Sequence, residues 1–479
     1  LVRPEDVQTL REVIKPYWKG KSLEDVLKKR YGKEISALST VVKINQKDHA
    51  QGHICPNVRE WLEKGPAGLK EEAQQHLLDC KEEQRPFYES ILLVMDGVCR
   101  FLMRYHDELQ KEAKQHPDWK QDMIETAEIC KALSKRPAET FHEAVQSMWI
   151  LFVVLHMESN ASSFSPGRLD EILYPYYRKD RELGRLDAQR ALDIIECLWL
   201  KFNQIVYLRN KNSAKYFAGF PIGFNIAVGG QDVHGEDVCN ELSFLFLLAQ
   251  EHIGLPQPNL SVRLHRGTGD ALLKKAVRVV AKGSGMPQFF NDEAIIAELE
   301  KLGISHQDAM DYAIVGCVEL TTQGNNLGWS DAAMFNLNKV LELTLHHGRC
   351  LLTNQQLGPD LGGLDTYESY EELESAFDAM IDHFLQRMIP ACEEVEKAHI
   401  DILPSPFLSS VIDDCMEQGM DVTRGGAHYN LSGIQMIQVA NLADSLAAIK
   451  ALVYDRKSVT GEALQYALEH NFAHDEMLR

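Results

Sequence analysis

Short apolar segments alternate with amphipathic helical patterns in the middle of the chain, and this alternation restricts the fold more than any other feature of the sequence. The segments GFNIAVGGQD, PNLSVRLH, MPQFFND and DYAIVGCVEL are each bounded by Gly, Pro or Asn and are rich in residues that favour strands. Helical patterns separate them. The sequence therefore predicts an α/β body.

The N-terminal part of the chain is predicted to be mainly helical. Apolar residues from Ile91 to Leu109 recur at spacings of three and four, which predicts a long helix that ends before Pro117. A second helix is predicted to begin with Pro137 in its first turn and to end at ESNASSFSPG. The residues Leu442, Leu446, Ile449 and Val453 predict another amphipathic helix near the C-terminal end.

Composition favours one large enzyme-like domain over residues 1–479. The chain is 45% hydrophobic and 25% charged, with no Pro, Gly or Ser-rich linker between different blocks. A net charge of -20 argues against binding to nucleic acids or anionic membranes, which favours a small-molecule partner. The longest apolar run, Met148 to Leu155, is too short to span a bilayer, and no signal-peptide pattern is present, so we expect a cytoplasmic protein.

The ten cysteines are scattered, without CxxC or paired spacing, and are predicted to be reduced thiols rather than zinc or iron-sulfur ligands. The segment HHGRC contains His346, His347 and Cys350, which could suggest a metal site. Adjacent histidines point in different directions and a fourth ligand is missing, so a cluster at a helix C-terminus is favoured. No metal is predicted.

Cys317 differs from the other cysteines because it follows the apolar segment AIVG and is followed two residues later by Glu319. A cysteine after a strand is commonly inert packing. Nucleophilic catalysis is disfavoured, because a neighbouring carboxylate raises the pKa of a thiol and so opposes thiolate formation. A neutral thiol, however, suits hydrogen-atom transfer.

Several blocks resemble the glycyl radical enzymes, in the pyruvate formate-lyase-like branch that contains dehydratases and lyases. GCVE is similar to the active-site loop of that branch, and the blocks INQKDHAQGH, MESNASSFSPGRLDEILYPYY, SAKYFAGFP, QPNLSVR, GMPQFFNDE and GWSDAAMFN follow in the family's order. The resemblance implies a ten-stranded α/β barrel of two half-sheets wrapped by helices, with a helical N-terminal portion. The Cys317 loop would lie inside this barrel, where radicals are shielded from water and oxygen.

The resemblance also implies roles for four catalytic residues. Cys317 would become a thiyl radical and take hydrogen from a substrate carbon that bears a hydroxyl. Glu319, on the same side of an extended loop, would remove the hydroxyl proton, and His53 would protonate the departing hydroxyl. Asp331 would bind substrate and orient His53, although a helix N-cap is an alternative role for this aspartate. His49 has no counterpart that we can assign.

Substrate binding is expected at Ser162 and Ser163. Glycerol and diol dehydratases typically have Gly-His-Ser where this chain has Ala161, Ser162 and Ser163. Ser163 keeps the substrate-binding hydroxyl, but Ser162 replaces an imidazole, which leaves extra volume and disfavours glycerol. SAKYFAGFP is expected to line the same cavity or to form plain core, without an assigned role.

The family's radical glycine lies in an RVxGY-like loop, and this chain has no such loop, so we expect a barrel that is incomplete at both ends and lacks the glycine radical domain. The expected function is a glycyl radical dehydratase or lyase. The alternatives are formate C-acetyltransferase, which needs two adjacent cysteines where this chain has Cys317 and Val318, and a non-catalytic scaffold that needs a glycine-bearing piece in trans. The expected cofactor is a glycyl radical installed by an S-adenosylmethionine iron-sulfur activase, and a homodimer is expected.

Overall fold

The computed structural model describes residues 3–42, 44, 52–206, 215 and 223–473. These residues form two compact units, which are described separately. The first unit comprises Ala50–Ser330 and Leu403–Ser432, and the second comprises Leu1–His49, Asp331–Ile402 and Gly433–Arg479. His49 and most of SAKYFAGFP, including Tyr216, Phe217 and Phe220, lie outside the described residues.

The Ala50–Ser330 unit begins with helices and continues with strands and helices in alternation. Its helices are α5 (Val58–Asp79, with non-helical geometry at Gly65), α6 (Arg85–Glu112), η2 (Pro117–Trp119), α7 (Lys120–Leu133), α8 (Phe141–Glu158), α9 (Leu169–Glu182), α10 (Ala188–Phe202), α12 (Glu241–Ile253), α13 (Asp270–Val279), η3 (Val280–Ser284), α14 (Asp292–Lys301), α15 (His306–Met310), α18 (Pro406–Ser409), α19 (Cys415–Gln418) and η4 (Val422–Arg424). Its strands are β1 (Gly167–Arg168), β2 (Asn225–Gly229), β3 (Asn259–Leu264), β4 (Gln288–Asn291), β5 (Tyr312–Val315) and β6 (Glu319–Thr322).

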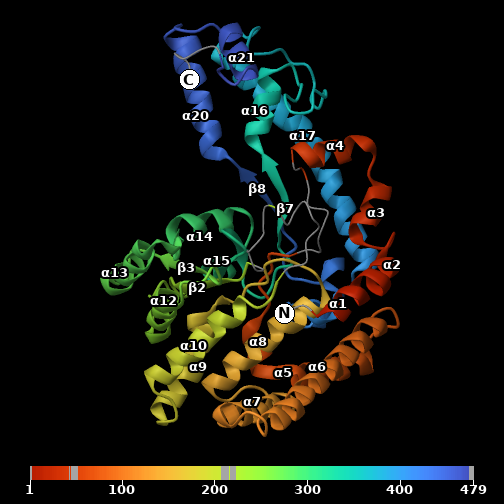
Figure 1. Cartoon of the computed structure of the whole chain (residues 1–479), viewed down its shortest axis with the longest axis vertical. Helices are drawn as coiled ribbons and strands as arrows, with labels where there is room; N and C mark the ends of the chain where they lie inside the picture. Colours follow the sequence, from red (N-terminus) through yellow and green to blue (C-terminus); the bar gives the residue numbers. More distant parts are fainter. Residues whose placement is uncertain (1–2, 43, 45–51, 207–214, 216–222, 474–479) are drawn as a thin grey trace. The chain divides into compact units, whose positions relative to one another are not determined.

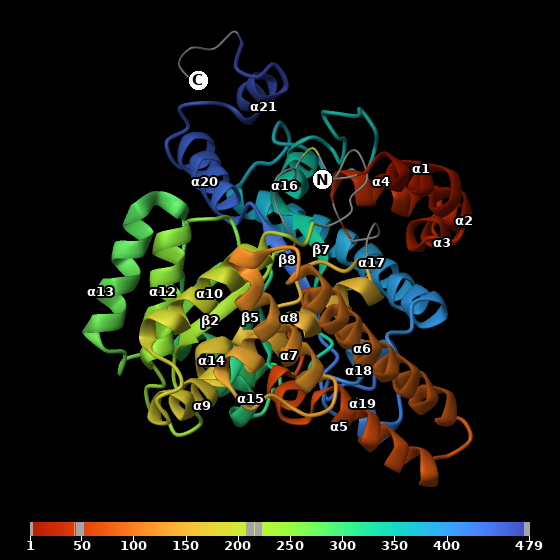
Figure 2. The ribbon, with the colours of Figure 1, turned by 60° about the horizontal axis from the view of Figure 1, so that its bottom comes forward.

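Strands β1 to β4 form a parallel sheet in sequence order, and β5 pairs with β6 in an antiparallel hairpin. Helices α9, α10 and α12 lie together beside β2 (Figures 1 and 2). Every residue of β2 is buried, as expected for a parallel strand covered by helices. The four apolar segments that predicted strands therefore all contain strands, and the predicted α/β alternation is confirmed.

Two of the predicted helices in this unit are present, with one corrected start. Helix α6 ends at Glu112, before Pro117, as predicted. Helix α8 begins at Phe141 rather than at Pro137. The reason is a capping box, in which the Thr140 side chain accepts a hydrogen bond from the backbone N–H of Glu143 and the Glu143 side chain bonds the backbone N–H of Thr140. This reciprocal cap fixes the helix start more strongly than the preference of proline for a first turn.

The second unit consists of α1 (Pro4–Thr9), η1 (Leu10–Ile14), α2 (Lys15–Trp18), α3 (Leu23–Arg30), α4 (Lys33–Val41), β7 (Trp329–Asn336), α16 (Leu337–Leu345), α17 (Tyr370–Ile402), β8 (Ser432–Ile437), α20 (Val439–Ile449), η5 (Lys450–Asp455) and α21 (Gly461–Glu469). Strand β7 pairs with β8. Helix α3 packs on α17, where the Tyr31 hydroxyl donates to the backbone carbonyl of Ala391 at 3.0 Å. The C-terminal amphipathic helix was predicted from Leu442 to Val453, and it is observed as α20 followed by the π-helical turns of η5.

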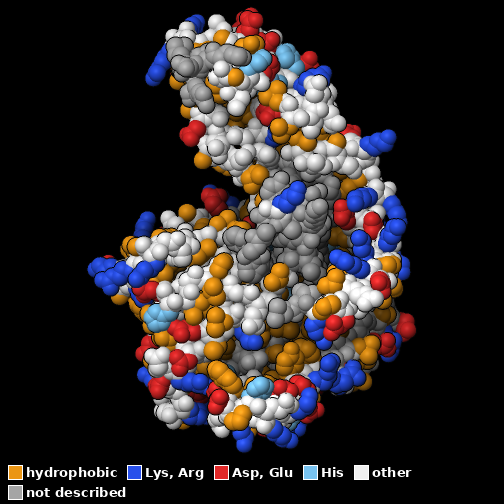
Figure 3. Space-filling view, in the orientation of Figure 1, with side chains coloured by type: hydrophobic (Ala, Val, Ile, Leu, Met, Phe, Trp, Pro, Cys, Tyr) orange, Lys and Arg blue, Asp and Glu red, His pale blue; other side chains and the backbone are white. Residues whose placement is uncertain are grey.

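Lys and Arg side chains are interspersed with Asp and Glu side chains over the face of the molecule that Figure 3 shows. Within the described part of the chain, no helix combines the length and the apolar character needed to cross a membrane.

Candidate active site

Cys317 lies at the tip of the β5–β6 hairpin. Val315 pairs with Glu319, so Gly316, Cys317 and Val318 form the turn between the two strands. The Cys317 side chain is exposed, and Val318 is 54% exposed. The prediction of a thiol directly after a strand is confirmed, whereas the extended geometry assumed between Cys317 and Glu319 is wrong. The chain reverses direction here, so the alternation of side chains along a strand does not apply.

The carboxylate of Glu319 folds back onto the turn. Its Oε2 atom accepts hydrogen bonds from the backbone N–H of Cys317 at 2.7 Å and from that of Val318 at 3.1 Å. The Glu319 residue is buried, with 8% of its surface exposed. A buried carboxylate is retained only where donors stabilise it, and two backbone amides of the turn provide that stabilisation. Glu319 therefore shapes the loop that carries the thiol.

His53 is placed beside Glu319 by the pairing of two distant segments. Ile54 and Phe164 form a parallel bridge, and the backbone N–H of His53 donates to the carbonyl of Ser162 at 2.8 Å. The Nε2 atom of His53 lies 3.8 Å from Oε2 of Glu319, and both side chains are buried. His53 has a φ of 59°, a left-handed conformation that is strained in a residue with a side chain.

Gly316 allows His53 and Glu319 to approach the hairpin closely. Its φ is 59°, and a Cβ atom at this position would lie closer than 3.0 Å to the imidazole of His53 and to the carboxylate of Glu319. Only glycine combines this backbone conformation with this lack of a side chain. The first residue of the GCVE motif is thus required by the packing of the two predicted catalytic side chains.

Ser162 and Ser163 lie in the segment that pairs with the His53 segment. Both are buried, and Ser163 adopts a φ of 64°. A Cβ atom on Gly223 would come within 2.6 Å of the Ser163 hydroxyl oxygen, so the backbone of Gly223 passes close to this hydroxyl. The structure thus brings Cys317, Glu319, His53 and the two serines into one region of the unit.

Asp331 belongs to the other unit, in strand β7. It is buried, and its Oδ1 atom accepts a hydrogen bond from Nε2 of Gln435 in β8 at 3.2 Å. The alternative role as a helix cap is wrong, because Asn336 caps α16 by accepting from the backbone N–H of Lys339 at 3.0 Å. Five residues of strand separate Asp331 from that helix.

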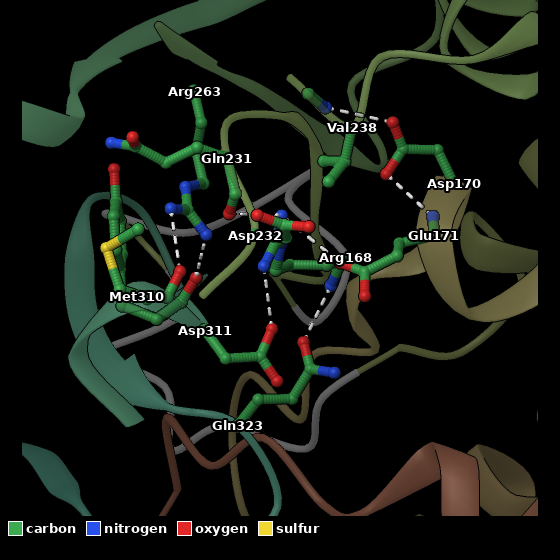
Figure 4. Close-up of polar contacts among 12 residues, drawn as sticks. Arg168, Asp170, Glu171, Gln231, Asp232, Val238, Arg263, Met310, Asp311 and Gln323 are labelled. Carbon is green, nitrogen blue, oxygen red and sulfur yellow. Dashed lines mark hydrogen bonds and ion pairs between the residues drawn. The ribbon is translucent and has the colours of Figure 1, made fainter. Parts of the chain in front are cut away.

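The buried Arg168 and the half-buried Arg59 hold the base of the hairpin, and Figure 4 shows the contacts of Arg168. The guanidinium of Arg168 donates to Asp311, which precedes β5, at 2.8 Å, and the backbone N–H of Arg168 donates to the side chain of Gln323, which follows β6, at 2.9 Å. Arg59 pairs with the other oxygen of Asp311 at 2.6 Å. Burial opposes ionisation of Asp311, but Arg59 and Arg168 outweigh it and hold the pKa of Asp311 below its usual value. Both ends of the hairpin are therefore fixed to strand β1.

The HHGRC segment lies at the end of helix α16, as predicted for a helix C-terminal cluster. His346 is the C-cap, and its Nδ1 atom lies 2.8 Å from the carbonyl oxygen of Glu342. His347 contacts Asp360 and Asp365 instead. Among the residues that the structure describes, no group of three or more His, Cys, Asp or Glu side chains is arranged to hold a metal ion.

Two asparagines of the site region were missed by the sequence reasoning. Asn225 and Asn259 occupy the first positions of β2 and β3, and both amide nitrogens donate to the carbonyl of Gly316, at 3.3 and 2.8 Å. An asparagine at the first position of each of two neighbouring buried strands is a signal that could have identified them. Asn259 is the asparagine of the QPNLSVR block.

Comparisons with known proteins place the chain in one family. Residues 1–479 match the family described as pyruvate formate lyase-like. The (2S)-3-sulfopropanediol dehydratase of Klebsiella oxytoca is 32% identical over 478 residues, which cover 96% of this chain and 58% of that enzyme.

Two solved structures are similar over nearly the whole chain. The glycerol-bound B12-independent glycerol dehydratase from Clostridium butyricum is 33% identical with a TM-score of 0.92, and the match covers 98% of this chain and 60% of that one. A glycyl radical enzyme from Archaeoglobus fulgidus is 30% identical with a TM-score of 0.90, over 99% of this chain and 62% of that one. The predicted α/β barrel fold class is confirmed. The chain spans about three fifths of the length of these relatives.

Proposed function

Because the chain belongs to the pyruvate formate lyase-like family, we propose that it forms the substrate-cleaving barrel of a glycyl radical dehydratase or related carbon-heteroatom lyase. The observation that carries this proposal is the arrangement around Cys317. A single thiol stands at an exposed hairpin tip, next to a buried carboxylate and within the same region as a buried imidazole. This set provides one hydrogen-atom carrier, one base and one acid.

The proposed cofactor is a glycyl radical, installed by an S-adenosylmethionine iron-sulfur activase. The radical would take the hydrogen atom of the Cys317 thiol, which leaves a thiyl radical on the sulfur atom. The exposure of the Cys317 side chain at a turn fits such a transfer, because another segment can reach the sulfur atom. None of the ten cysteines, all of which the structure describes, takes part in a disulfide, which supports a reducing, cytoplasmic location as part of this proposal.

In the proposed reaction, Cys317 takes a hydrogen atom from a substrate carbon that bears a hydroxyl. Glu319 accepts the proton of that hydroxyl, and His53 donates a proton to the neighbouring hydroxyl, which leaves as water. Cys317 then returns its hydrogen atom to the substrate, so that the net reaction converts a diol into a carbonyl compound and water. The 3.8 Å between Nε2 of His53 and Oε2 of Glu319 supports these two roles, because the proton that Glu319 has accepted can be returned to His53 between turnovers.

The proposed substrate is a small hydroxylated compound that is larger than glycerol or carries a different polar group. Ser163 would bind a substrate hydroxyl, and Ser162 would leave space that an imidazole would otherwise fill. The relative from Klebsiella oxytoca is named for a sulfopropanediol, which combines two hydroxyls with an extra anionic group. Asp331 would bind a second hydroxyl and orient His53.

Dehydration is favoured over acetyl transfer because Val318 follows Cys317, so the chain lacks a second adjacent thiol that could hold an acetyl group. We also propose that residues 1–479 act as one domain, because the family match runs over all of them. A homodimer and a dedicated activase complete the proposed assembly.

The proposal is tested with the full-length protein, activated anaerobically and supplied with a panel of diols, sugar alcohols and sulfonated polyols. We expect a carbonyl product and water from at least one of them. Acetyl-coenzyme A and formate from pyruvate, with no diol consumed, would overturn the dehydratase assignment.

A further inference from the structure

We infer that Asn225 and Asn259 are positioning residues that fix the peptide group before Cys317, and thereby the location of its sulfur atom. The inference rests on the proposed function, in which that sulfur must meet one particular carbon-bound hydrogen. The side chains of the hairpin turn are exposed, whereas its backbone is held by hydrogen bonds.

The side chains of Cys317 and Val318 are exposed, and exposed turns are usually the mobile parts of a protein. The peptide group between Gly316 and Cys317, however, is held by hydrogen bonds at both its carbonyl and its N–H. The Gly316 carbonyl accepts two hydrogen bonds, one from Asn225 and one from Asn259. The N–H of the same peptide group, on Cys317, donates to Glu319 at 2.7 Å. Both polar atoms of one peptide group are therefore held by buried side chains.

The register of strands β2 and β3 brings the two asparagine side chains to the same carbonyl oxygen, that of Gly316. Asn225 and Asn259 are direct partners across the parallel pair β2 and β3, so their side chains lie on the same face of the sheet. A carbonyl oxygen has two lone pairs, and the two amides fill both. A single donor would leave the peptide group free to rotate about that bond, whereas two donors from adjacent strands oppose rotation.

The other ends of both amides are bonded, which fixes their orientation. The Ser261 hydroxyl donates to Oδ1 of Asn225 at 2.8 Å, and the side chain of Gln257 lies 3.4 Å from Oδ1 of Asn259. Asn225 is fully buried and Asn259 is 6% exposed. Burying a side-chain amide costs free energy unless its N–H and C=O groups are hydrogen-bonded. Here one N–H of each amide bonds the carbonyl of Gly316, the residue before the thiol.

The positioning role predicts a specific pattern in variants that lose the amide donors. Asn225→Asp and Asn259→Asp keep the side-chain volume but place a carboxyl oxygen against the Gly316 carbonyl. In the activated full-length enzyme we expect the kcat of each variant to fall by about 10- to 100-fold, because small displacements of a reacting atom cost this much. We expect KM to change less than about twofold, since Ser162 and Ser163 are untouched. The isotope effect with substrate deuterated at the hydroxyl-bearing carbon should rise.

A second measurement does not depend on turnover. Hydrogen-deuterium exchange of the backbone amides should become about tenfold faster at Cys317 and Val318 in either variant, the amount expected when one hydrogen bond is lost. Exchange in the remainder of β2 and β3 should stay unchanged. The matched control is Asn240→Asp, because the Asn240 amide also donates to two backbone carbonyls, those of Asp170 and Val238, away from the hairpin. It should alter neither kcat nor exchange at the turn.

The outcomes are separable. Wild-type kcat and unchanged exchange at the turn would overturn the positioning role. Faster exchange throughout β2 and β3, with kcat following thermal stability, would also overturn it in favour of a purely structural role. An activated wild-type enzyme that consumes no hydroxylated substrate would refute the proposed function, and the exchange measurement would still decide whether the asparagines fix the turn.

Discussion

His53 and Glu319, which are 266 positions apart in the sequence, place Nε2 and Oε2 only 3.8 Å apart, and both atoms lie against the position that a Cβ atom on Gly316 would occupy. The imidazole comes from the segment paired with Ser162, and the carboxylate comes from the first residue of β6. Because both side chains press against the hydrogen-bonded turn, the geometry of the proposed acid and base depends on the conformation of the loop that carries the thiol.

A methyl group at Gly316 should disrupt this arrangement. Gly316→Ala would force a Cβ atom against His53 and Glu319 at a positive φ, and we expect a loss of about 1–3 kcal/mol in stability with at least about 100-fold lower kcat. The control is Gly303→Ala, where φ is also positive, at 87°, but nothing lies within 4 Å of the added methyl. Chemical unfolding and steady-state kinetics of both variants separate backbone strain from steric displacement. Equal effects in the two variants would contradict the close-packing argument.

Replacing Glu319 with glutamine should remove the base while keeping the turn. The Gln side-chain oxygen can still accept from the N–H groups of Cys317 and Val318, so folding should be retained. We expect kcat to fall by about 10²- to 10⁴-fold, the usual contribution of a general base, and a substrate radical to accumulate. Electron paramagnetic resonance during turnover checks both points. Product formed at the wild-type rate would exclude Glu319 as the base.

Glycerol should be a poor substrate of the full-length enzyme, because Ser162 stands where glycerol-type sites have histidine. We expect its kcat/KM to be at least about tenfold below that of a larger hydroxylated substrate, and Ser162→His to narrow the difference. Competition kinetics between glycerol and sulfonated or longer polyols measure the ratio. Efficient glycerol turnover by the wild type would show that the pocket argument is wrong.

Stability should fall as the pH rises from about 4.5 to about 7, owing to Glu158 at the end of α8. Burial raises the pKa of Glu158 to about 7, against the opposing effect of hydrogen bonds from the N–H groups of Phe407 and Leu408. The folded state therefore holds a proton that the unfolded state releases near its ordinary pKa of 4.5, so this contribution is complete below the ordinary pKa and is lost as the pH rises through the raised one.

We expect the loss across this window to be about 3 kcal/mol. Urea unfolding at several pH values measures it. Glu158→Gln cannot titrate and should show a flatter profile between the two pKa values. A wild-type profile that rises through the same window, and that the variant reproduces, would contradict the assignment.

The parts of the fold that depend on local pattern were predictable from the sequence. The four segments contain strands because β-branched and aromatic residues bounded by Gly, Pro and Asn favour strands. The start of α8 was misplaced because a Pro at position 137 and a capping box at Thr140 both signal a helix start, and the box prevailed.

The identities of several site residues were predictable from the sequence, but their arrangement in space was not. The resemblance named Cys317, Glu319 and His53, but the hairpin turn that reverses the chain at Gly316 could not be deduced from alternation. The roles of Asn225 and Asn259 depend on the register of two parallel strands and on where a distant turn meets them, which are long-range relationships that no local pattern encodes.

The most direct test of the account is the Cys317→Ser variant of the full-length enzyme, activated beside the wild type and followed by electron paramagnetic resonance and product analysis. An O–H bond is too strong to form the transfer radical readily, so we expect the variant to fold, to acquire the glycyl signal and to form no product. Wild-type enzyme under the same conditions should show the signal and convert a hydroxylated substrate into a carbonyl compound. Turnover by Cys317→Ser near the wild-type rate would contradict the assignment of hydrogen-atom transfer to this thiol.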